Sequence, residues 1–533
     1  MPELTWIGKD KVVNHHHAVP FRVLDKQYTS GEEGTGNKII HGDNLAALKS
    51  LLPEYEGRIK CVYIDPPYNT GNEGWVYNDN VNDPKLKKWL HQVVGKEGED
   101  LSRHDKWLCM MYPRLKLLRR LLSDDGVIFV SIDDNEIHNL RPIVNEIFGE
   151  RNRIEQFIWK KSYGGGAKER FAITVHEYVL LYAKNIDRTD EIWLPPDPNS
   201  EERYYKLKDS KVEERGPYRI KPLEATKSMD RRENLSYGIP GPDSQDIWPK
   251  RQWWWSKERS FAALENDELV FTKARDGGIS ISYKQYMFGN DGKQRASKPF
   301  SIIDGIYTQK GTGDLLAIFD ERLTLQFPKP VELIERLLQM MCAKDPDAII
   351  LDSFAGSGTT AHAVLKMNAA DGGNRKFILI EQEDYAETIT AERIRRVIDG
   401  YGEGTKVVAG SGGGFEYYEI GKPLFHEDGN LNEEIGIDEI RKYVAYTENL
   451  AAHKQVAVDN EQSPYRLGEQ DDTAYFFLYE KDKLTTLDLE FLSKLKSRRK
   501  SMVLYADICL LTKQQLQKYG IIFKKIPRDI TRF

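Results

Sequence analysis

The chain has 533 residues, 40% of them hydrophobic and 30% charged, which is enough material for about two to four globular domains. Its formal net charge of −6 argues against a uniformly basic nucleic-acid coat, so any contact with DNA must be concentrated in local patches. No apolar run approaches the roughly 18 residues of a membrane span and the first residues carry no signal sequence, so we expect a cytoplasmic protein without membrane contact.

The sequence has no recognisable metal-binding pattern. Its 4 cysteines lie far apart without a Cys-x-x-Cys pair, which argues against a disulfide framework or a zinc ribbon. The adjacent histidines His15 to His17 point in different directions and have no evident partner cluster, so we interpret them as a polar loop and expect no metal. They belong to residues 1–37, a polar and irregular stretch that predicts an arm packed against the main domain or a partner.

An acidic residue follows the first predicted strand. Residues 38–41, with Ile39 and Ile40 at their centre, predict a short strand, and Gly42 and Asp43 lead from it into an amphipathic helix that begins near Leu45. At the carboxyl end of a strand, the Asp43 carboxylate could accept a hydrogen bond from the adenine-like ring of a cofactor. It could also cap the N-terminus of the following helix, and the two roles are compatible.

A rigid turn follows the second predicted strand. The apolar run 61–64 leads into Asp65-Pro66-Pro67-Tyr68, and open α/β sheets bind their ligands at the carboxyl ends of such strands. Proline has no N–H and holds φ near about −65°, which makes the turn stiff. Asp65 and the Pro66 carbonyl could each accept one hydrogen of an exocyclic amino group while Tyr68 stacks on the ring, so that the amine lone pair is available for attack. The alternative is an ordinary proline turn.

The α/β rhythm continues to about residue 185. The hydrophobic pattern predicts a helix over 104–122 and strands over 127–132, 153–159 and 177–183. Ahead of this helix, residues 72–100 are polar and predict a mobile flap that could cover a flipped base.

A basic, glycine-rich loop joins the last two of these strands. It runs from Lys160 to Lys168 and matches neither a Walker A motif nor a dinucleotide fingerprint. We expect Lys160, Lys161 and Lys168 to touch the DNA backbone, with a plain linker as the alternative.

The pattern then changes to a polar insert rich in proline, glycine and aromatic residues. Residues 203–259 carry 14 lysines and arginines against 9 acidic residues, although the chain as a whole is acidic. The mixture of cations and aromatic rings indicates contacts to phosphates and bases, and we expect Arg231, Arg232, Arg251 and Trp254 to bind DNA. The same residues could instead form the core and the solvated face of a small β domain.

The α/β pattern resumes near residue 325. A helix begins after Lys329-Pro330, and the buried strand 348–351 leads into a glycine loop, Asp352-Ser-Phe-Ala-Gly-Ser-Gly-Thr-Thr, which opens another helix. Glycines let the backbone approach a ligand closely, and the helix N-terminus offers unpaired N–H groups. The next strand ends in Glu381, whose carboxylate could bind ribose hydroxyls.

The two motifs resemble those of a known family. Asp65-Pro66-Pro67-Tyr68 resembles the catalytic motif of amino-methylating DNA methyltransferases, and the longer form ending Asn-Thr-Gly resembles type III restriction-modification Mod subunits and related β-class adenine enzymes. Phe-x-Gly-x-Gly-Thr at 354–359 resembles the S-adenosylmethionine motif of the same family. Lys329-Pro330 resembles the element that contacts the methionine end of that cofactor.

The resemblance implies a Rossmann-like α/β methyltransferase domain that is circularly permuted. Its catalytic half would be 38–185, its cofactor half 325–420, with a target-recognition domain at 186–324 and a small α/β module at 421–533. The residues it assigns to catalysis are Asp65, Pro66, Pro67 and Tyr68. Those it assigns to the cofactor are Asp43, Lys329, Asp352, Phe354, Gly356, Gly358, Thr359 and Glu381.

The implied reaction is methylation of N6 of a flipped adenine in duplex DNA, with S-adenosylmethionine as cofactor. Adenine is favoured over N4 of cytosine because the motif begins with Asp65 rather than with the serine more usual in cytosine enzymes. A second hypothesis is a DNA-reading subunit that delivers a helicase-nuclease (Res-like) partner, with methylation secondary, and a remoter one is an RNA target. The resemblance also implies a homodimer, and any ATP-driven step must come from a partner because the sequence has no Walker A motif.

Overall fold

A computed structural model of the protein describes most of the chain. The described residues are 3–70, 88, 102–164, 171–195, 204–225, 232–274, 277–319, 328–450, 464–495 and 500–528. The chain divides into two compact units, one made of Met1–Glu191 with Phe300–Phe533 and the other of Ile192–Pro299, and each is described by itself. No helix in the described part of the chain is both long enough and apolar enough to cross a membrane.

A ten-stranded mixed sheet forms the centre of the first unit, in the strand order β1-β17-β2-β14-β13-β3-β4-β6-β5-β12. The strands are β1 (Arg22–Gly31), β2 (Lys38–His41), β3 (Ile59–Ile64), β4 (Leu122–Ile132), β5 (Arg153–Lys160), β6 (His176–Ala183), β12 (Ile302–Ile303), β13 (Ile349–Asp352), β14 (Lys376–Glu381) and β17 (Gly414–Pro423). Neighbouring strands from β17 through β4 are parallel, so their carboxyl ends lie along one edge. Strand β6 is antiparallel to β4 and to β5.

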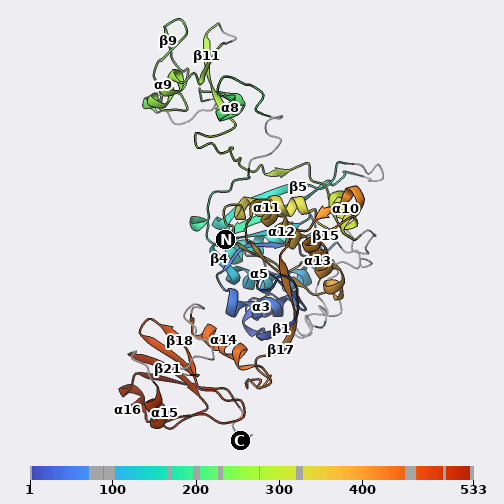
Figure 1. Ribbon diagram of the computed structural model, residues 1–533, viewed down its shortest axis with the longest axis vertical. Coiled ribbons are helices and arrows are strands. Elements are labelled where there is room, and N and C mark those ends of the chain that lie inside the picture. Colours follow the sequence, from blue (N-terminus) through green and yellow to red (C-terminus); the bar gives the residue numbers. More distant parts are fainter. Residues whose placement is uncertain are drawn as a thin grey trace. The chain divides into compact units, whose positions relative to one another are not determined.

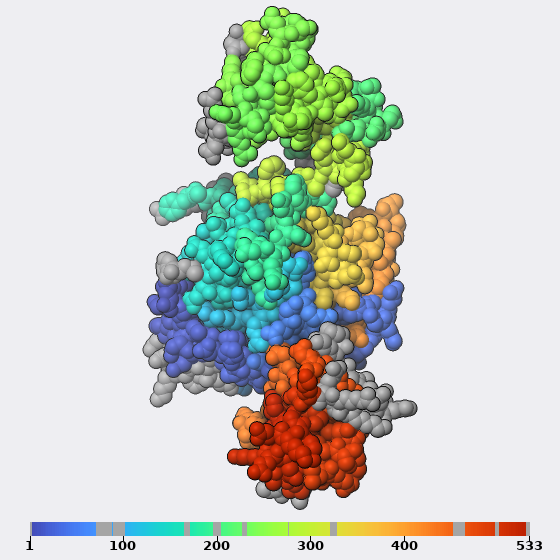
Figure 2. All heavy atoms as spheres, turned by 90° about the vertical axis from the view of Figure 1, so that its left-hand side faces the viewer, coloured from blue at the N-terminus to red at the C-terminus, as the bar shows by residue number. Residues whose placement is uncertain are grey.

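Segments far apart in the sequence build this one sheet. Strands β13 and β14 are inserted between β2 and β3, although more than half the chain separates them in sequence from these neighbours. In Figure 2, blue and cyan atoms from the first part of the chain adjoin yellow and orange atoms from the later part at the surface. The carboxyl edge therefore combines loops from both halves.

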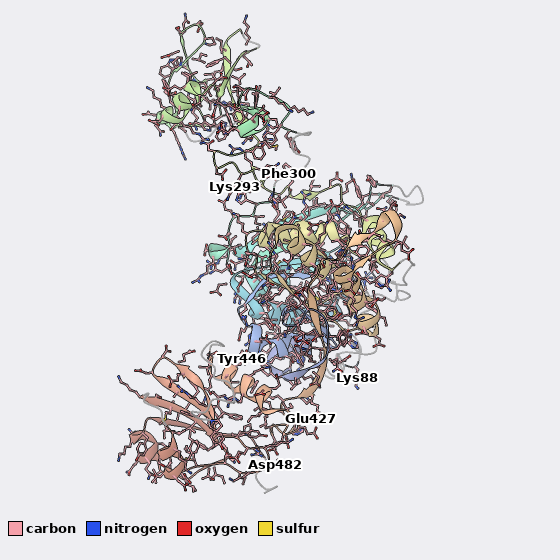
Figure 3. The ribbon with its side chains drawn as sticks, viewed as in Figure 1. Lys88, Lys293, Phe300, Glu427, Tyr446 and Asp482 are labelled. Carbon is pink, nitrogen blue, oxygen red and sulfur yellow. The ribbon has the colours of Figure 1, made fainter. Side chains whose placement is uncertain are left out.

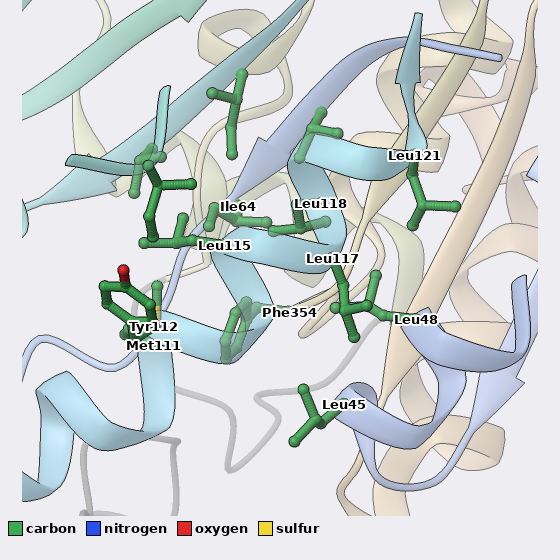
Figure 4. Packing of buried hydrophobic residues seen from close by; sticks show 14 of the residues in the cluster. Leu45, Leu48, Ile64, Met111, Tyr112, Leu115, Leu117, Leu118, Leu121 and Phe354 are labelled. Carbon is green, nitrogen blue, oxygen red and sulfur yellow. The ribbon is translucent and has the colours of Figure 1, made fainter. Parts of the chain in front are cut away.

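Helices cover both faces of the sheet (Figure 1). They are α3 (Asn44–Tyr55), α5 (Arg103–Leu121), α6 (Ile137–Phe148), α10 (Thr308–Phe319), α11 (Val331–Cys342), α12 (Thr359–Asp371) and α13 (Glu392–Asp399). Leucines of α3 and α5 pack on Ile64 of β3 in one hydrophobic cluster, which Figure 4 shows from close by. Cys61, three residues earlier in the same strand, points to the opposite face and contacts Cys342 of α11. Helix α5 begins with a capping box between Ser102 and Asp105.

The N-terminal stretch differs from its prediction. Instead of an irregular arm, residues 22–31 form β1, which pairs antiparallel with β17. The pairing satisfies backbone groups that β17 would otherwise expose at the edge of the sheet. His15–Ala18 form the short helix α2 rather than a loop, and the Lys49 ammonium binds the carbonyls of His16 and His17 at 2.9 and 3.3 Å. Strand β17 also carries the central sheet to Pro423, past the boundary predicted at 420.

The described residues after β17 form a small α/β module. It contains α14 (Ile437–Thr447), α15 (Leu489–Lys494), α16 (Lys513–Lys518) and a four-stranded sheet in the order β18-β19-β21-β23. These strands are β18 (Arg466–Gln470), β19 (Thr473–Phe477), β21 (Ser501–Ala506) and β23 (Ile521–Lys525). Tyr446 of α14, labelled in Figure 3, accepts a hydrogen bond from Arg120 at the end of α5, at 2.6 Å.

The second unit is a small antiparallel domain with its own core. Its sheet has the order β10-β11-β7, from β7 (Tyr218–Pro222), β10 (Leu269–Lys273) and β11 (Ile279–Tyr286), with helix α9 (Lys257–Glu265) beside it. Trp253 is 2% exposed in the core, whereas Trp254 is 48% exposed. The unit is shorter than the predicted insert of 186–324, because β12 pairs with β5 and α10 packs on α13 in the first unit.

Candidate active site

Four acidic residues follow four adjacent strands at one edge of the central sheet. Asp43 comes after β2, Glu381 ends β14, Asp352 ends β13 and Asp65 follows β3. These strands are neighbours in the order β2-β14-β13-β3 and are parallel, so the four carboxyl groups line the edge in that order. Ligands of open α/β sheets bind at this edge.

The proline turn after β3 is held from several sides. Pro66 and Pro67 are buried, and the indole N–H of Trp107 on α5 donates a hydrogen bond to the Pro67 carbonyl at 2.6 Å. Asn69 has a φ of 56°, and its side-chain amide donates to the buried Glu136 carboxylate and, at 3.2 Å, to the carbonyl of Arg103. The turn is therefore rigid in its surroundings as well as in its own backbone.

A buried ionic cluster surrounds the Asp65 carboxylate. Lys329 Nζ lies 2.9 Å from both Asp65 oxygens and 3.5 Å from Glu177 Oε2. Glu177, from β6, accepts a hydrogen bond from the Tyr68 hydroxyl at 2.9 Å and another from Lys161 Nζ at 2.9 Å. The Tyr68 ring is thereby fixed, with the Lys329 ammonium 4.8 Å from its centroid.

The cluster balances burial against opposite charge. Burial raises the pKa of Asp65, and the attraction of Lys329 offsets this only in part. Burial also disfavours ionised Glu177, but Lys329 and Lys161 hold the pKa of its carboxyl below the usual range. Burial disfavours the charged form of Lys329 as well, yet Asp65 and Glu177 keep its pKa above the ordinary lysine value. Lys329 therefore stays an ammonium between two carboxyl groups.

The glycine loop after β13 forms a second part of the site. Gly356 and Gly358 have φ of 52° and 80°, which favour glycine, and Gly358 is the N-cap of α12. The Gly356 N–H donates to Glu381 Oε2 at 2.7 Å, and its carbonyl accepts from the Thr390 hydroxyl at 2.5 Å. The buried Arg393 guanidinium donates to the hydroxyls of Ser357 and Thr359 at 2.7 and 2.9 Å. These contacts fix the glycine loop against α13 and the residues just before it.

Two buried carboxyl groups below this loop have strongly shifted pKa values. Burial raises the pKa of Asp352 to about 7, although it accepts hydrogen bonds from the Phe354 N–H at 3.0 Å and the Thr360 hydroxyl at 2.5 Å. Burial likewise raises the pKa of Glu381 to about 7. The Phe354 side chain lies in the hydrophobic cluster beside α5 and is 6% exposed (Figure 4).

Asp43 fills one of its two predicted roles in the structure. Its Oδ1 accepts a hydrogen bond from the Ala46 N–H at 2.8 Å, which makes it the N-cap of α3. Its Oδ2 lies 3.6 Å from the Arg114 guanidinium, and the side chain is 51% exposed. The second role, contact with a cofactor ring, stays a prediction.

The residues predicted to contact DNA fall in both units of the chain. Lys161 lies on Glu177 in the ionic cluster, and Lys160 Nζ lies 3.4 Å from Asp304. Arg232, Arg251 and Trp254 are exposed in the second unit. Lys168, Arg231 and, apart from Lys88, the predicted flap of 72–100 lie outside the described residues.

Sequence reasoning missed four residues that support the site: Trp107, Glu136, Glu177 and Arg393. Glu177 carried a usable signal, because it is the one acidic residue in a strand whose later residues, 178–183, are all apolar or aromatic. The other three contact backbone or side chains that are distant in the sequence. Among the described residues, no group of three or more histidine, cysteine or acidic side chains is arranged to hold a metal ion.

This arrangement defines a class of protein: an α/β enzyme whose parallel sheet presents a glycine loop and a rigid carboxylate-bearing turn side by side at its carboxyl edge. The chain belongs to the DNA methylase family, whose family model matches residues 59–392.

Similar proteins include modification enzymes of two kinds. The chain is 33% identical over 419 residues to the type III restriction-modification enzyme StyLTI Mod subunit of Salmonella typhimurium, covering 74% of this chain and 61% of that protein. It is 31% identical to the EcoPI Mod subunit of Escherichia phage P1, covering 72% and 63%, and 32% identical to the type II methyltransferase M.KpnI of Klebsiella pneumoniae, covering 68% and 84%. The chain thus spans less than two thirds of the type III relatives it matches.

Solved structures give only distant matches. The PvuII DNA methyltransferase, which is cytosine-N4-specific, has a TM-score of 0.35 and 14% identity, covering 70% of this chain and 89% of that protein. The complex of M1.HpyAVI with SAM has a TM-score of 0.31 and 14% identity, covering 67% and 98%. Similarity at this level carries no argument about function.

Proposed function

We propose that the protein is an S-adenosylmethionine-dependent DNA methyltransferase that modifies N6 of adenine, and that it serves as the modification subunit of a type III-like restriction-modification system. One observation carries the proposal. The Asp65 carboxylate and the Tyr68 ring stand on a rigid turn at the end of β3, and the neighbouring strand β13 leads into the glycine loop at the N-terminus of α12. An amine held on the turn is therefore next to whatever the loop binds.

The turn suits an aromatic amine. Asp65 and the Pro66 carbonyl would accept its two hydrogens, and the Tyr68 ring would stack on the base. Two acceptors of this kind draw electron density toward the amine nitrogen and orient its lone pair. The Trp107 and Asn69 hydrogen bonds keep both acceptors in place without reorganisation. Because a paired base cannot reach a buried turn, base flipping is part of the proposal, at a cost of a few kcal/mol.

The chemistry of the edge fits S-adenosylmethionine. Gly356 and Gly358 would let the cofactor approach the backbone, and the N-terminus of α12 offers N–H groups. Glu381 would accept hydrogen bonds from the ribose hydroxyls. The half-exposed Asp43 would accept a hydrogen bond from the adenine amine. When bound, the cofactor supplies an electrophilic methyl group on sulfur. Residues of the chain bind and orient the cofactor and the base, and they exclude water.

The choice of base and of system rests on the relatives. Three type III Mod subunits are 28 to 33% identical to the chain, and the motif begins with Asp65. In that setting, the second unit would be the target-recognition domain, inserted into a circularly permuted methyltransferase domain. Double-stranded DNA would be the substrate, and a second copy of the chain and a helicase-nuclease subunit would be its partners.

A labelled-methyl assay tests the proposal. The protein is incubated with labelled S-adenosylmethionine and mixed-sequence duplex DNA, and the digested DNA is analysed for modified nucleosides. We expect N6-methyladenine. N4-methylcytosine would keep the reaction and overturn the base, whereas unlabelled DNA in the presence of bound cofactor would favour a subunit that delivers a partner to DNA.

A further inference from the structure

The Lys329 ammonium lies where the proposed function would place the target amine. Its nitrogen is a hydrogen-bond donor that lies 2.9 Å from both oxygens of Asp65 and 4.8 Å from the Tyr68 ring centroid. The Trp159 ring centroid is 5.9 Å away. A nitrogen donor between the Asp65 carboxylate and an aromatic face is what the proposed function requires of the target amine. In this structure, that place belongs to a lysine of the chain itself.

The target amine and Lys329 therefore compete for the same acceptor. The Lys329 and Asp65 side chains are only 10% and 17% exposed, so neither charge can be left without a partner at low cost. A neutral amine is a weaker partner for a carboxylate than an ammonium is. The base can take Asp65 only if the ammonium has another carboxylate to move to.

Glu177 offers that second carboxylate. Its Oε2 is 3.5 Å from Lys329 Nζ, so a small shift of the ammonium turns a long contact into a hydrogen-bonded ion pair. Glu177 is anchored by the Tyr68 hydroxyl and by Lys161 Nζ, each at 2.9 Å, and its side chain is 10% exposed. It therefore stays in place while the lysine moves.

We propose that Lys329 holds the place of the target amino group in the DNA-free enzyme, and that Glu177 is the positioning residue that takes over the Lys329 ammonium when the base arrives. The exchange leaves the Lys329 ammonium paired with a carboxylate after the base binds, while Asp65 accepts the hydrogen bond of the target amine. The inference rests on the proposed function, because it takes Asp65 as the acceptor of the target amine.

Three variants test the exchange. Glu177→Gln keeps an oxygen that accepts from Tyr68 but removes the charge that draws Lys329 away. Lys329→Met removes the ammonium and keeps the unbranched stem. The third variant combines both. We expect Glu177→Gln to lower kcat/KM for DNA about tenfold or more at saturating cofactor, and the double variant to recover most of this loss, since no ammonium then competes for Asp65.

A fluorescence readout needs no methyl transfer. 2-Aminopurine is placed beside the adenine that the labelled-methyl assay identifies, so that the target keeps its 6-amino group. Its fluorescence in the cofactor-free complex rises when that adenine leaves the base stack. We expect Lys329→Met to raise the signal above wild type and Glu177→Gln to lower it. A lysine that merely supports the fold or the substrate would give a lower signal in Lys329→Met, and that result overturns the inference.

Matched controls separate the possible failures. Tyr68→Phe removes the hydroxyl bound to Glu177 and keeps the ring. If it lowered kcat/KM for DNA as much as Glu177→Gln does, Glu177 would act through Tyr68 and not through Lys329. Effects of the two single variants that simply multiply in the double variant would also overturn the exchange. A wild-type protein that leaves DNA unlabelled overturns the proposed function itself, and the exchange with it.

Discussion

Lys329 and Asp65 are 264 residues apart in the sequence, and their side chains form a buried ion pair at the carboxyl end of β3. Asp65 comes from the part of the chain before the second unit and Lys329 from the part after it. The pair therefore joins the proline turn to the segment that leads into α11, beside the glycine loop of β13.

Gly356→Asp should abolish cofactor binding and with it methyl transfer. Gly356 has a φ of 52°, and its N–H donates to the buried Glu381 at 2.7 Å, so a new carboxylate there would be strained and would face another acid. The control is Gly372→Asp at the other end of α12, where φ is 71° and the space around the glycine is open. It should cost roughly 1–2 kcal/mol of stability and leave cofactor affinity unchanged in calorimetric titration. If Gly356→Asp and Gly372→Asp bound the cofactor equally well, the glycine loop would not be the cofactor site.

Trp107→Phe should slow transfer by loosening the proline turn. It removes the indole N–H that reaches the Pro67 carbonyl at 2.6 Å and leaves a buried acceptor unpaired, at a cost of about 1–3 kcal/mol. Trp253→Phe is the matched control, since Trp253 donates to the Tyr237 carbonyl at 2.8 Å in the core of the second unit. Both variants should unfold at lower temperature. Only Trp107→Phe should lower kcat at saturating DNA and cofactor. If Trp253→Phe lowered kcat by the same factor, the effect would come from lost stability and not from the proline turn.

The Glu381 carboxyl should make folding stability depend on pH. Burial raises its pKa from 4.5 to about 7, so between these values the folded protein holds a proton that the unfolded chain has released. This contribution to stability therefore falls as pH rises from about 4.5 to 7. Glu381→Gln removes this pH-dependent contribution. The melting temperature of the variant minus that of wild type should therefore increase from pH 5 to pH 8.

A carboxyl shifted the other way gives the control for this pH dependence. The hydrogen bonds of Arg375 hold the pKa of Asp371 below its ordinary value of 3.8. The stabilisation that Asp371 contributes is therefore lost only as the pH falls below that value. The melting temperature of Asp371→Asn relative to wild type should therefore stay constant between pH 5 and pH 8. A constant difference for Glu381→Gln as well would mean that Glu381 is not buried in its neutral form.

Arg232→Gln and Arg251→Gln should weaken binding to duplex DNA and reduce its salt dependence. Both side chains are exposed in the second unit, and removing one cation that neutralises a phosphate should change the slope of log K against log salt by about 0.9. Lys273→Gln, an exposed residue of β10 in the same unit, makes the same change of charge. If all three variants changed the slope equally, the effect would reflect net charge and not a contact surface.

The strands and the acidic residues at their ends could be predicted from the sequence. Each of β2, β3, β13 and β14 is a short apolar run followed or ended by an acid, and a strand buried on both faces leaves this local signature. The partners of those acids left no such signature. That Lys329 reaches Asp65, or that Glu177 fixes Tyr68, depends on how strands distant in sequence are ordered in the sheet.

The N-terminal strand could not be predicted for a different reason. Residues 22–31 are mostly polar, because β1 lies at the edge of the sheet and none of its residues is fully buried. An edge strand needs backbone pairing more than an apolar face, so hydrophobic alternation does not reveal it. Aromatic residues of the second unit were ambiguous for a similar reason, since burial separates Trp253 from its exposed neighbour Trp254 and composition does not.

The most direct test of the central claim compares wild type with Asp65→Ala in transfer of labelled methyl to duplex DNA, with cofactor affinity measured in parallel. We predict labelled N6-methyladenine with wild type, a loss of transfer on the order of a thousandfold or more in Asp65→Ala, and cofactor affinity that is nearly unchanged. Near-normal turnover by Asp65→Ala on the same DNA would contradict the assignment of the proline turn as the place where the amine is methylated.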